Sequence, residues 1–211
     1  MPKLIDHTER RSEIAEALWR IALREGVSGV SIREVAAEAG ISAGSLRHVF
    51  ADKEELLEFS MRLIYDRVAA RIQERARIRD PLRRADAILA ELLPFDDNRR
   101  VEMHVNLAMV TESVAHPGLA TAAVEAHEGL RALCVRVLSD LREHGLVDGD
   151  RDLDAEAVRL HALIDGLAMH LLLAGTDSRD QTRAAVSEHL ASLKHPQTPR
   201  GVARRPCTAP L

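Results

Sequence analysis

The feature that most constrains the fold of this 211-residue chain is the segment 31–57, which reads SIREVAAEAGISAGSLRHVFADKEELL. Ser31 followed three residues later by Glu34 has the pattern of a capping box, which starts a helix. Gly40 is typical of the residue that ends one, because glycine adopts the left-handed conformation at low cost. Ser42 then favours the start of another short helix. The segment therefore predicts two short helices around a glycine turn.

The rest of the chain is also predicted to be helical. Apolar residues between Ile14 and Ala22 recur at helical spacing, and Asp52 caps a long fourth helix that we expect to run to about Arg79, where Pro81 breaks it. The composition, with 46% hydrophobic but only 2% aromatic residues, favours helices, and no segment has the pattern of a strand. We therefore predict an all-α fold of about nine helices, the later ones near 85–92, 99–116, 119–144, 153–174 and 179–194.

We expect the fourth helix to join two domains rigidly. The boundary is placed near Leu57, which gives an N-terminal three-helix domain, 1–57, and a larger helical domain, 58–194. The segment 195–211 contains four prolines, three arginines and no acidic residue, so we expect a disordered tail. That tail is either a solvated end or an accessory contact to DNA.

Charge and cysteine content limit the classes of protein that fit. The formal net charge is −4, and residues 1–52 carry seven Lys or Arg against eight Asp or Glu, so a surface that binds nucleic acid must be basic locally. Cys134 and Cys207 are not expected to form a disulfide, which fits a reducing compartment. The N-terminus has no apolar signal region, and no apolar run approaches the ~18 residues of a membrane span. We therefore expect a cytoplasmic protein without a membrane partner.

The segment 31–57 has the residue types that a DNA-reading helix-turn-helix needs. Small residues at the start of its second helix let the backbone approach base edges, and polar or basic residues at helix starts can contact phosphates. Arg47 can reach a phosphate or donate two hydrogen bonds to guanine. The plainer alternative is a pair of short helices in a helical protein. The candidate DNA-binding residues are Ser31, Arg33, Ser42, Ala43, Gly44, Ser45, Arg47, His48 and Lys53.

Residues 8–57 resemble the DNA-binding domain of TetR/AcrR-family transcriptional regulators. The matching elements include Ser31-Ile32-Arg33-Glu34-Val35-Ala36, Ala39-Gly40-Ile41-Ser42, Gly44-Ser45-Leu46, Phe50 and Lys53-Glu54-Glu55-Leu56-Leu57. The chain departs from the family at Arg47-His48-Val49, where the family usually has a tyrosine that contacts phosphate. This variant, with Asp165-Gly166-Leu167-Ala168 farther on, resembles the members that have a BetI-like C-terminal region.

The resemblance implies a repressor that binds a near-palindromic operator in double-stranded DNA as a homodimer and releases it when a small-molecule effector binds. It implies a dimer interface on the last two helices, for which the apolar stripes suggest Leu160, Leu163, Ile164, Leu167, Leu171, Val186, Leu190 and Leu193. It also implies an effector pocket between the middle helices, for which helical position suggests Tyr65, Met103, Asn106, Leu107, Val110, Thr111, His127, Leu130, Cys134 and Met169. Ordinary core packing is the alternative for each of these residues.

Other functions have weaker support in the sequence. No nucleophile elbow, phosphate-binding glycine loop or catalytic triad pattern is present, so we do not expect an enzyme or a cofactor. His161 and Asp165 have no third ligand at metal-binding spacing, so no metal is expected. The alternative is a helical small-molecule-binding or scaffold protein without specific DNA recognition. Lys3, Arg10 and Arg11 are either further contacts to DNA or part of a solvated N-terminus.

Overall fold

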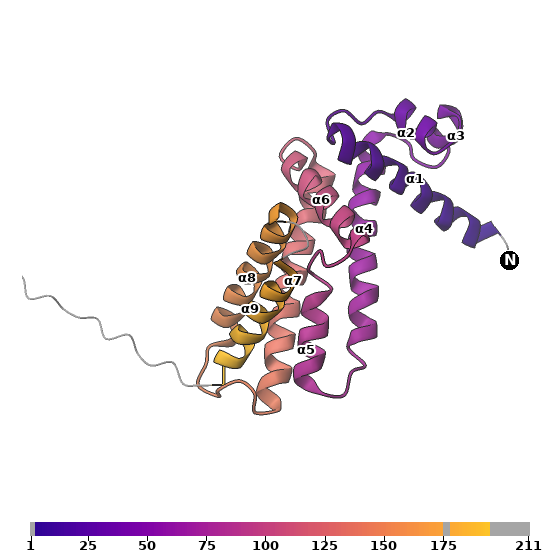
Figure 1. Cartoon of the computed structure of the whole chain (residues 1–211). Coiled ribbons are helices and arrows are strands. Elements are labelled where there is room, and N and C mark those ends of the chain that lie inside the picture. Colours follow the sequence, from indigo (N-terminus) through magenta and orange to yellow (C-terminus); the bar gives the residue numbers. More distant parts are fainter. Residues whose placement is uncertain (1–2, 175–177, 195–211) are drawn as a thin grey trace, which may run out of the picture.

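The computed structural model describes residues 3–174 and 178–194, and all regular structure in these ranges is helical (Figure 1). The predicted all-α class and the number of helices are thus confirmed for this part of the chain. No described helix is long and apolar enough to cross a membrane. The helices are α1 (Lys3–Glu25), α2 (Ile32–Glu38), α3 (Ala43–Arg47), α4 (Lys53–Arg75), α5 (Pro81–Ala90), α6 (Asp97–Glu112), α7 (Pro117–Glu143), α8 (Leu153–Ala174) and α9 (Arg179–Ser192).

Local capping explains the starts of the short N-terminal helices. The Ser31 hydroxyl accepts a hydrogen bond from the Glu34 amide at 3.3 Å, and the Glu34 carboxylate accepts one from the Ser31 amide at 3.0 Å. The predicted capping box is therefore confirmed. Ser42 caps α3 in the same way, through the Ser45 amide at 3.0 Å. Gly40 lies between the two helices with φ of +67°, a conformation that other residues adopt only at a cost.

Several helix limits differ by a few residues from the expected ones, and two of them show the effect of the flanking residues. α4 ends at Arg75 rather than near Arg79, and the chain turns before Asp80 caps α5. α6 begins at Asp97, two residues earlier than expected, because the Asp96 carboxylate accepts a hydrogen bond from the Arg99 amide at 2.9 Å.

The helices pack around two hydrophobic cores, with α4 running from the end that carries α2 and α3 along one side of the body (Figure 1). The first core joins α1–α4 to α6 and the start of α7, through Val105, Met109, Leu119 and Ala122. The second core joins α5, the second half of α7, α8 and α9. The packing therefore does not divide at residue 57, since α4 residues beyond it belong to the first core. The tail 195–211 lies outside the described residues.

Most of the residues suggested for a dimer interface are instead buried within the chain itself. Six of them are at most 2% exposed and belong to the second core: Leu160, Ile164, Leu171, Val186, Leu190 and Leu193. Leu163 and Leu167 are half-buried. These six residues pack inside the second core of the same chain, because the most apolar stripe of each helix lies against neighbouring helices of that core. A dimer interface on α8 and α9 would use the residues of these helices that face outward.

Candidate nucleic-acid interface

The helix α3 presents one face to solvent because Leu46 fixes the other face in the core. Leu46 and Phe50 are fully buried, so the remaining positions of this five-residue helix and its flanks point outward. The structure thus brings most of the candidate DNA-binding residues to one surface next to α2. Ser31, Arg33, Ser42, Gly44, Ser45, Arg47 and His48 are exposed, and Ala43 and Lys53 are half-buried.

The serines at the helix starts accept hydrogen bonds from backbone amides, and so cap the helices through their oxygen atoms. The Ser42 oxygen accepts from the Ser45 amide and lies 2.9 Å from the Ser45 hydroxyl oxygen. A serine hydroxyl can accept one hydrogen bond and donate another, so capping does not exclude a contact to phosphate. The roles expected for Ser31 and Ser42 are compatible with this geometry.

Ion pairing separates the charges of this near-neutral domain. The Glu38 carboxylate receives hydrogen bonds from Arg20 at 2.7 Å and Arg24 at 3.1 Å, which lower the pKa of Glu38. Glu34 is held in the capping box. By contrast, Arg33 and Arg47 are exposed and form no ion pair with the described residues. The exposed residues of α2 and α3 therefore include two arginines, Arg33 and Arg47, whose charges no described carboxylate pairs.

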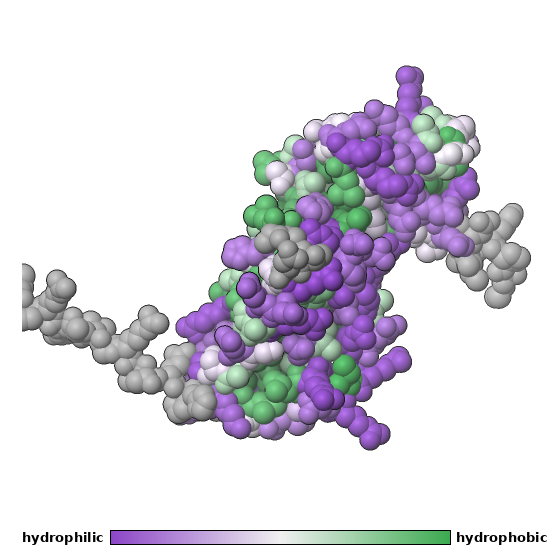
Figure 2. Space-filling view, in the orientation of Figure 1, coloured by the Kyte–Doolittle hydropathy of each residue, from purple (hydrophilic) through white to green (hydrophobic). Residues whose placement is uncertain are grey.

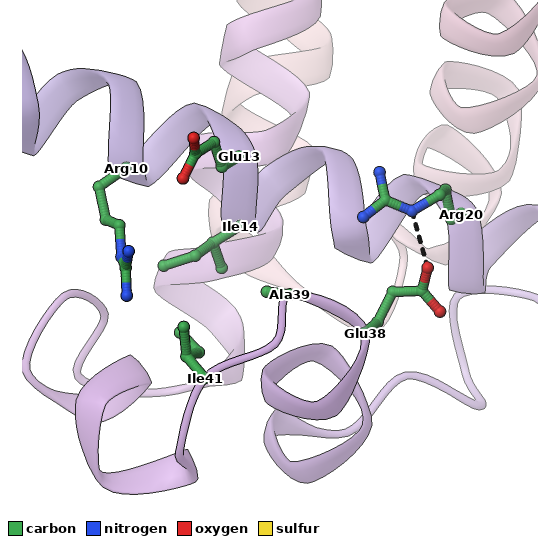
Figure 3. Close-up of a pocket in the computed structure, with 7 residues that line it drawn as sticks. All are labelled: Arg10, Glu13, Ile14, Arg20, Glu38, Ala39 and Ile41. Atoms are coloured by element: carbon green, nitrogen blue, oxygen red, sulfur yellow. Dashed lines mark hydrogen bonds and ion pairs between the residues drawn. The ribbon is translucent and has the colours of Figure 1, made fainter.

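A polar pocket of about 260 Å³ lies between α1 and the turn that precedes α3. In Figure 3 the exposed Arg10 side chain extends from α1 toward Ile41, the residue before Ser42. Arg10 thus adds a cation at the start of α3, as the sequence allowed. The structure gives no side-chain description of Lys3, and it turns Arg11 away from this surface and into the domain.

The residues suggested for an effector pocket do not all converge. The Tyr65 hydroxyl donates to the Asn106 side-chain oxygen at 2.8 Å, so these two join α4 to α6, and burial raises the pKa of Tyr65. Cys134 is fully buried in the second core, and Met103 and Leu130 pack against that core. Leu107 is half-buried. Four others are exposed on the surface: Val110, Thr111, His127 and Met169.

Thr111 shows why a polar residue on an apolar helix need not line a pocket. Its hydroxyl donates to the Leu107 carbonyl oxygen at 2.9 Å, four residues back on the same helix. This local bond satisfies a polar side chain without a buried partner or ligand. Asn106, by contrast, has a partner on another helix.

The Nε2 atom of His161 lies 3.3 Å from a carboxylate oxygen of Asp165. The ring centroids of His161 and His127 are 4.7 Å apart. Among the described residues, no three His, Cys, Asp or Glu side chains are placed to hold a metal ion.

The sequence reasoning missed a cluster of buried charges between α4, α5 and α6. Glu91 and Glu102 are each only 5% exposed. Arg71 of α4 bonds Glu102 at 2.8 Å and pairs with Glu91 at 3.2 Å, while Arg75 and Arg99 also pair with Glu91. The sequence feature that could have predicted this cluster is the four-residue spacing of Arg67, Arg71 and Arg75, which places them on one face of α4. These ion pairs connect the second half of α4 to the end of α5 and to α6.

Comparison with known proteins agrees with this architecture. Residues 14–58 match the family described as bacterial regulatory proteins, tetR family, and residues 81–195 match the family described as BetI-type transcriptional repressor, C-terminal. The chain is 37% identical over 196 residues to the HTH-type transcriptional regulator PksA of Bacillus subtilis, covering 92% of this chain and 94% of PksA. It is 34% identical over 179 residues to the regulator BetI of Burkholderia thailandensis, covering 83% and 88%.

Solved structures show the same fold. A transcriptional regulator from Rhodococcus superposes with a TM-score of 0.75 at 29% identity, covering 87% of this chain and 95% of that one. A putative regulator from Saccharomonospora viridis, solved in complex with choline, superposes with a TM-score of 0.69 at 29% identity, covering 88% and 95%. Both the extent of the family matches and the identity to PksA exceed what shared helical architecture alone would give. The chain belongs to the TetR family of helix-turn-helix transcriptional regulators, a non-enzymatic family, and carries a BetI-type C-terminal domain.

Proposed function

We propose that this protein is a ligand-responsive repressor that binds a near-palindromic operator as a homodimer and releases it when an effector binds. The observation that supports this most directly is the continuity of α4, which begins beside the α3 surface and reaches the buried charges of the body without interruption. A shift of the body against α4 would therefore move α3. Because its partner is chromosomal DNA, we place the protein in the cytoplasm.

The dimer surface we propose is the outward face of α8 and α9. On α8 the exposed residues at helical spacing are small or apolar, and on α9 they include small residues. Small side chains let helices of two subunits approach closely and form a four-helix interface. Figure 2 shows apolar residues gathered near the end of the body where α8 ends. The α8 residues are Val158, Ala162, Gly166, Met169 and Leu173, and those of α9 are Ala184, Ser187 and Ala191.

Light scattering tests this surface. We expect wild type to have the mass of two chains, and Ala162→Glu to have the mass of one, because it places a charge in the centre of the proposed contact. Ala69→Glu, at an exposed position of α4, is the matched control and should remain a dimer. A dimeric Ala162→Glu protein would contradict this interface.

We propose that the effector binds beside the Tyr65–Asn106 pair, between α4 and α6, and that it is not held by an aromatic cage. The choline-bound relative raises the possibility of a quaternary ammonium ligand. Such ligands are commonly recognised by several aromatic faces. Here the sequence has only five aromatic residues other than histidine, and Phe50 and Phe59 pack together while Phe95 lies under Arg183. Trp19 packs under Arg67, which leaves Tyr65 alone.

The test starts from a duplex that wild-type protein enriches from a random-sequence DNA library. Compounds that bind the free protein, found by thermal shift, are then titrated with and without this duplex. Coupling between two sites is reciprocal, so a compound that releases the duplex must bind the duplex-bound protein more weakly by the same factor. Equal affinity with and without the duplex would contradict induction by that compound. Choline is the negative control and should leave duplex binding unchanged.

A further inference from the structure

Arg11 of α1 is held inside the DNA-binding domain rather than offered to DNA. Its guanidinium carbon lies 4.3 Å from the ring centroid of Phe50 and 4.5 Å from that of Phe59, and the two rings are 5.3 Å apart. The side chain is 25% exposed. Its neighbour Arg10, by contrast, is exposed at the pocket beside α3. Arg10 and Arg11 are neighbours in the sequence, but Arg10 faces the pocket and Arg11 packs against Phe50 and Phe59.

The same guanidinium fixes the segment that leaves α3. One Arg11 nitrogen donates to the Val49 carbonyl oxygen at 3.3 Å, and another donates to the Glu55 carboxylate at 3.0 Å. The second Glu55 oxygen accepts a hydrogen bond from the Ala51 amide at 2.8 Å. Arg11 and Glu55 therefore hold residues 49–51 from two sides, and connect α1, the end of α3 and the start of α4.

A helix of five residues needs such a constraint. Leu46 is the buried residue within α3 itself and fixes its depth in the domain. A second fixed point, at the end of the helix, sets its tilt, and the buried Phe50 with the Arg11 contacts to its ring and to Val49 supplies it. Base contacts require side chains to be placed within about 0.5 Å and 10–20°. A change of tilt would displace Arg47 and Ser45 while leaving the domain folded.

We propose that Arg11 is a positioning residue for α3: it sets the angle at which α3 meets base edges, and thereby specificity, without touching DNA. This role rests on the operator binding proposed above. Arginine is required because a lysine ammonium has neither the planar fork that reaches the carbonyl and the carboxylate together nor a flat face to pack on two rings.

The experiment compares Arg11→Lys and Glu55→Gln with wild type on two duplexes, the one enriched by wild type and a scrambled duplex of the same length. Arg11→Lys keeps the charge and the fold-stabilising bulk. Glu55→Gln keeps an amide oxygen for the Ala51 amide but weakens the bond from Arg11. Arg77→Lys, at an exposed position after α4, is the matched control for an arginine-to-lysine change away from α3. Melting temperature, salt dependence and both affinities are measured for each protein.

We expect the ratio of enriched-duplex to scrambled-duplex affinity to fall about tenfold in Arg11→Lys, the fold-change that loss of one base contact produces. Glu55→Gln should lower the same ratio. The slope of log affinity against log salt for Arg11→Lys should equal that of wild type, since no phosphate contact is lost. Arg77→Lys should keep the wild-type ratio.

Three results would overturn the proposal. An unchanged ratio in Arg11→Lys, with or without a lower melting temperature, would make the role purely structural. Equal losses on both duplexes, with a salt slope reduced by about one, would make Arg11 a phosphate contact. Failure of wild type to enrich any duplex would refute the proposed operator binding itself, whereas an enriched duplex with an unchanged ratio would refute only the role of Arg11.

Discussion

At the residue level, we propose that operator recognition depends most on Arg47. It is exposed at the end of α3 without an ion pair among the described residues, at the position where the family usually has tyrosine. We predict that Arg47→Ala weakens binding to the enriched duplex by about 1–3 kcal/mol if Arg47 contacts a guanine. Titration of enriched and scrambled duplexes measures this, with Arg33→Ala as comparison. A loss of the same size on both duplexes would mean that Arg47 contacts phosphate only.

One buried histidine, His161, and one half-buried histidine, His189, predict a pH dependence of stability. Burial lowers the pKa of His189, and burial likewise lowers the pKa of His161, with the carboxylate of Asp165 opposing the latter shift. The folded state therefore prefers the neutral rings, so their contribution is present above the unfolded pKa of about 6.5 and is lost as pH falls through the lower folded pKa. Chemical unfolding between pH 7.5 and 5 should show decreasing stability. His189→Leu should reduce this decrease, and an unchanged decrease would contradict the assignment.

At the scale of elements, two glycines of the helix-turn-helix predict opposite effects of the same substitution. Gly40 has φ of +67°, so Gly40→Ala should lower the free energy of unfolding by about 1–2 kcal/mol. Gly44 lies in α3, where an added Cβ would meet only Ser42 at 3.7 Å, so Gly44→Ala should raise that free energy by about 0.5–1 kcal/mol. Gly44→Ala should nevertheless weaken duplex binding, because its methyl group lies on the face offered to DNA. If the Gly44→Ala protein were more stable but bound the duplex with unchanged affinity, this face of α3 would not be the surface that contacts DNA.

The elements also show where sequence reasoning succeeds and where it stops. Capping is local, so Ser31, Ser42 and Asp52 predicted their helices correctly. The apolar stripes of α8 were correctly identified, but periodicity does not say which neighbour a stripe covers, and Leu160 and Leu171 proved to be core. The Arg11 contacts join residues 38 and 44 positions apart, and the partners of Glu91 come from two other helices, α4 and α6. Such long-range pairs have no local signature.

At the scale of the whole molecule, the first core links DNA-binding helices directly to the body. Residues of α6 and α7 share this core with α1 and α4, and Arg62 of α4 bonds Glu125 of α7 at 2.6 Å. Movement of α6 beside Tyr65 would therefore act on α1 and α4 together. This explains physically how an effector in the body could change the separation of two α3 helices in a dimer.

We propose that two chains read one near-palindromic site through paired α3 helices, with half-sites about 34–36 Å apart or a multiple of that distance. Sedimentation of the protein with the enriched duplex, and with a duplex that keeps only one half of it, tests this arrangement. We predict an even number of chains on the full duplex and much weaker binding to the half duplex. One chain per full duplex, with equal affinity for the half duplex, would contradict it.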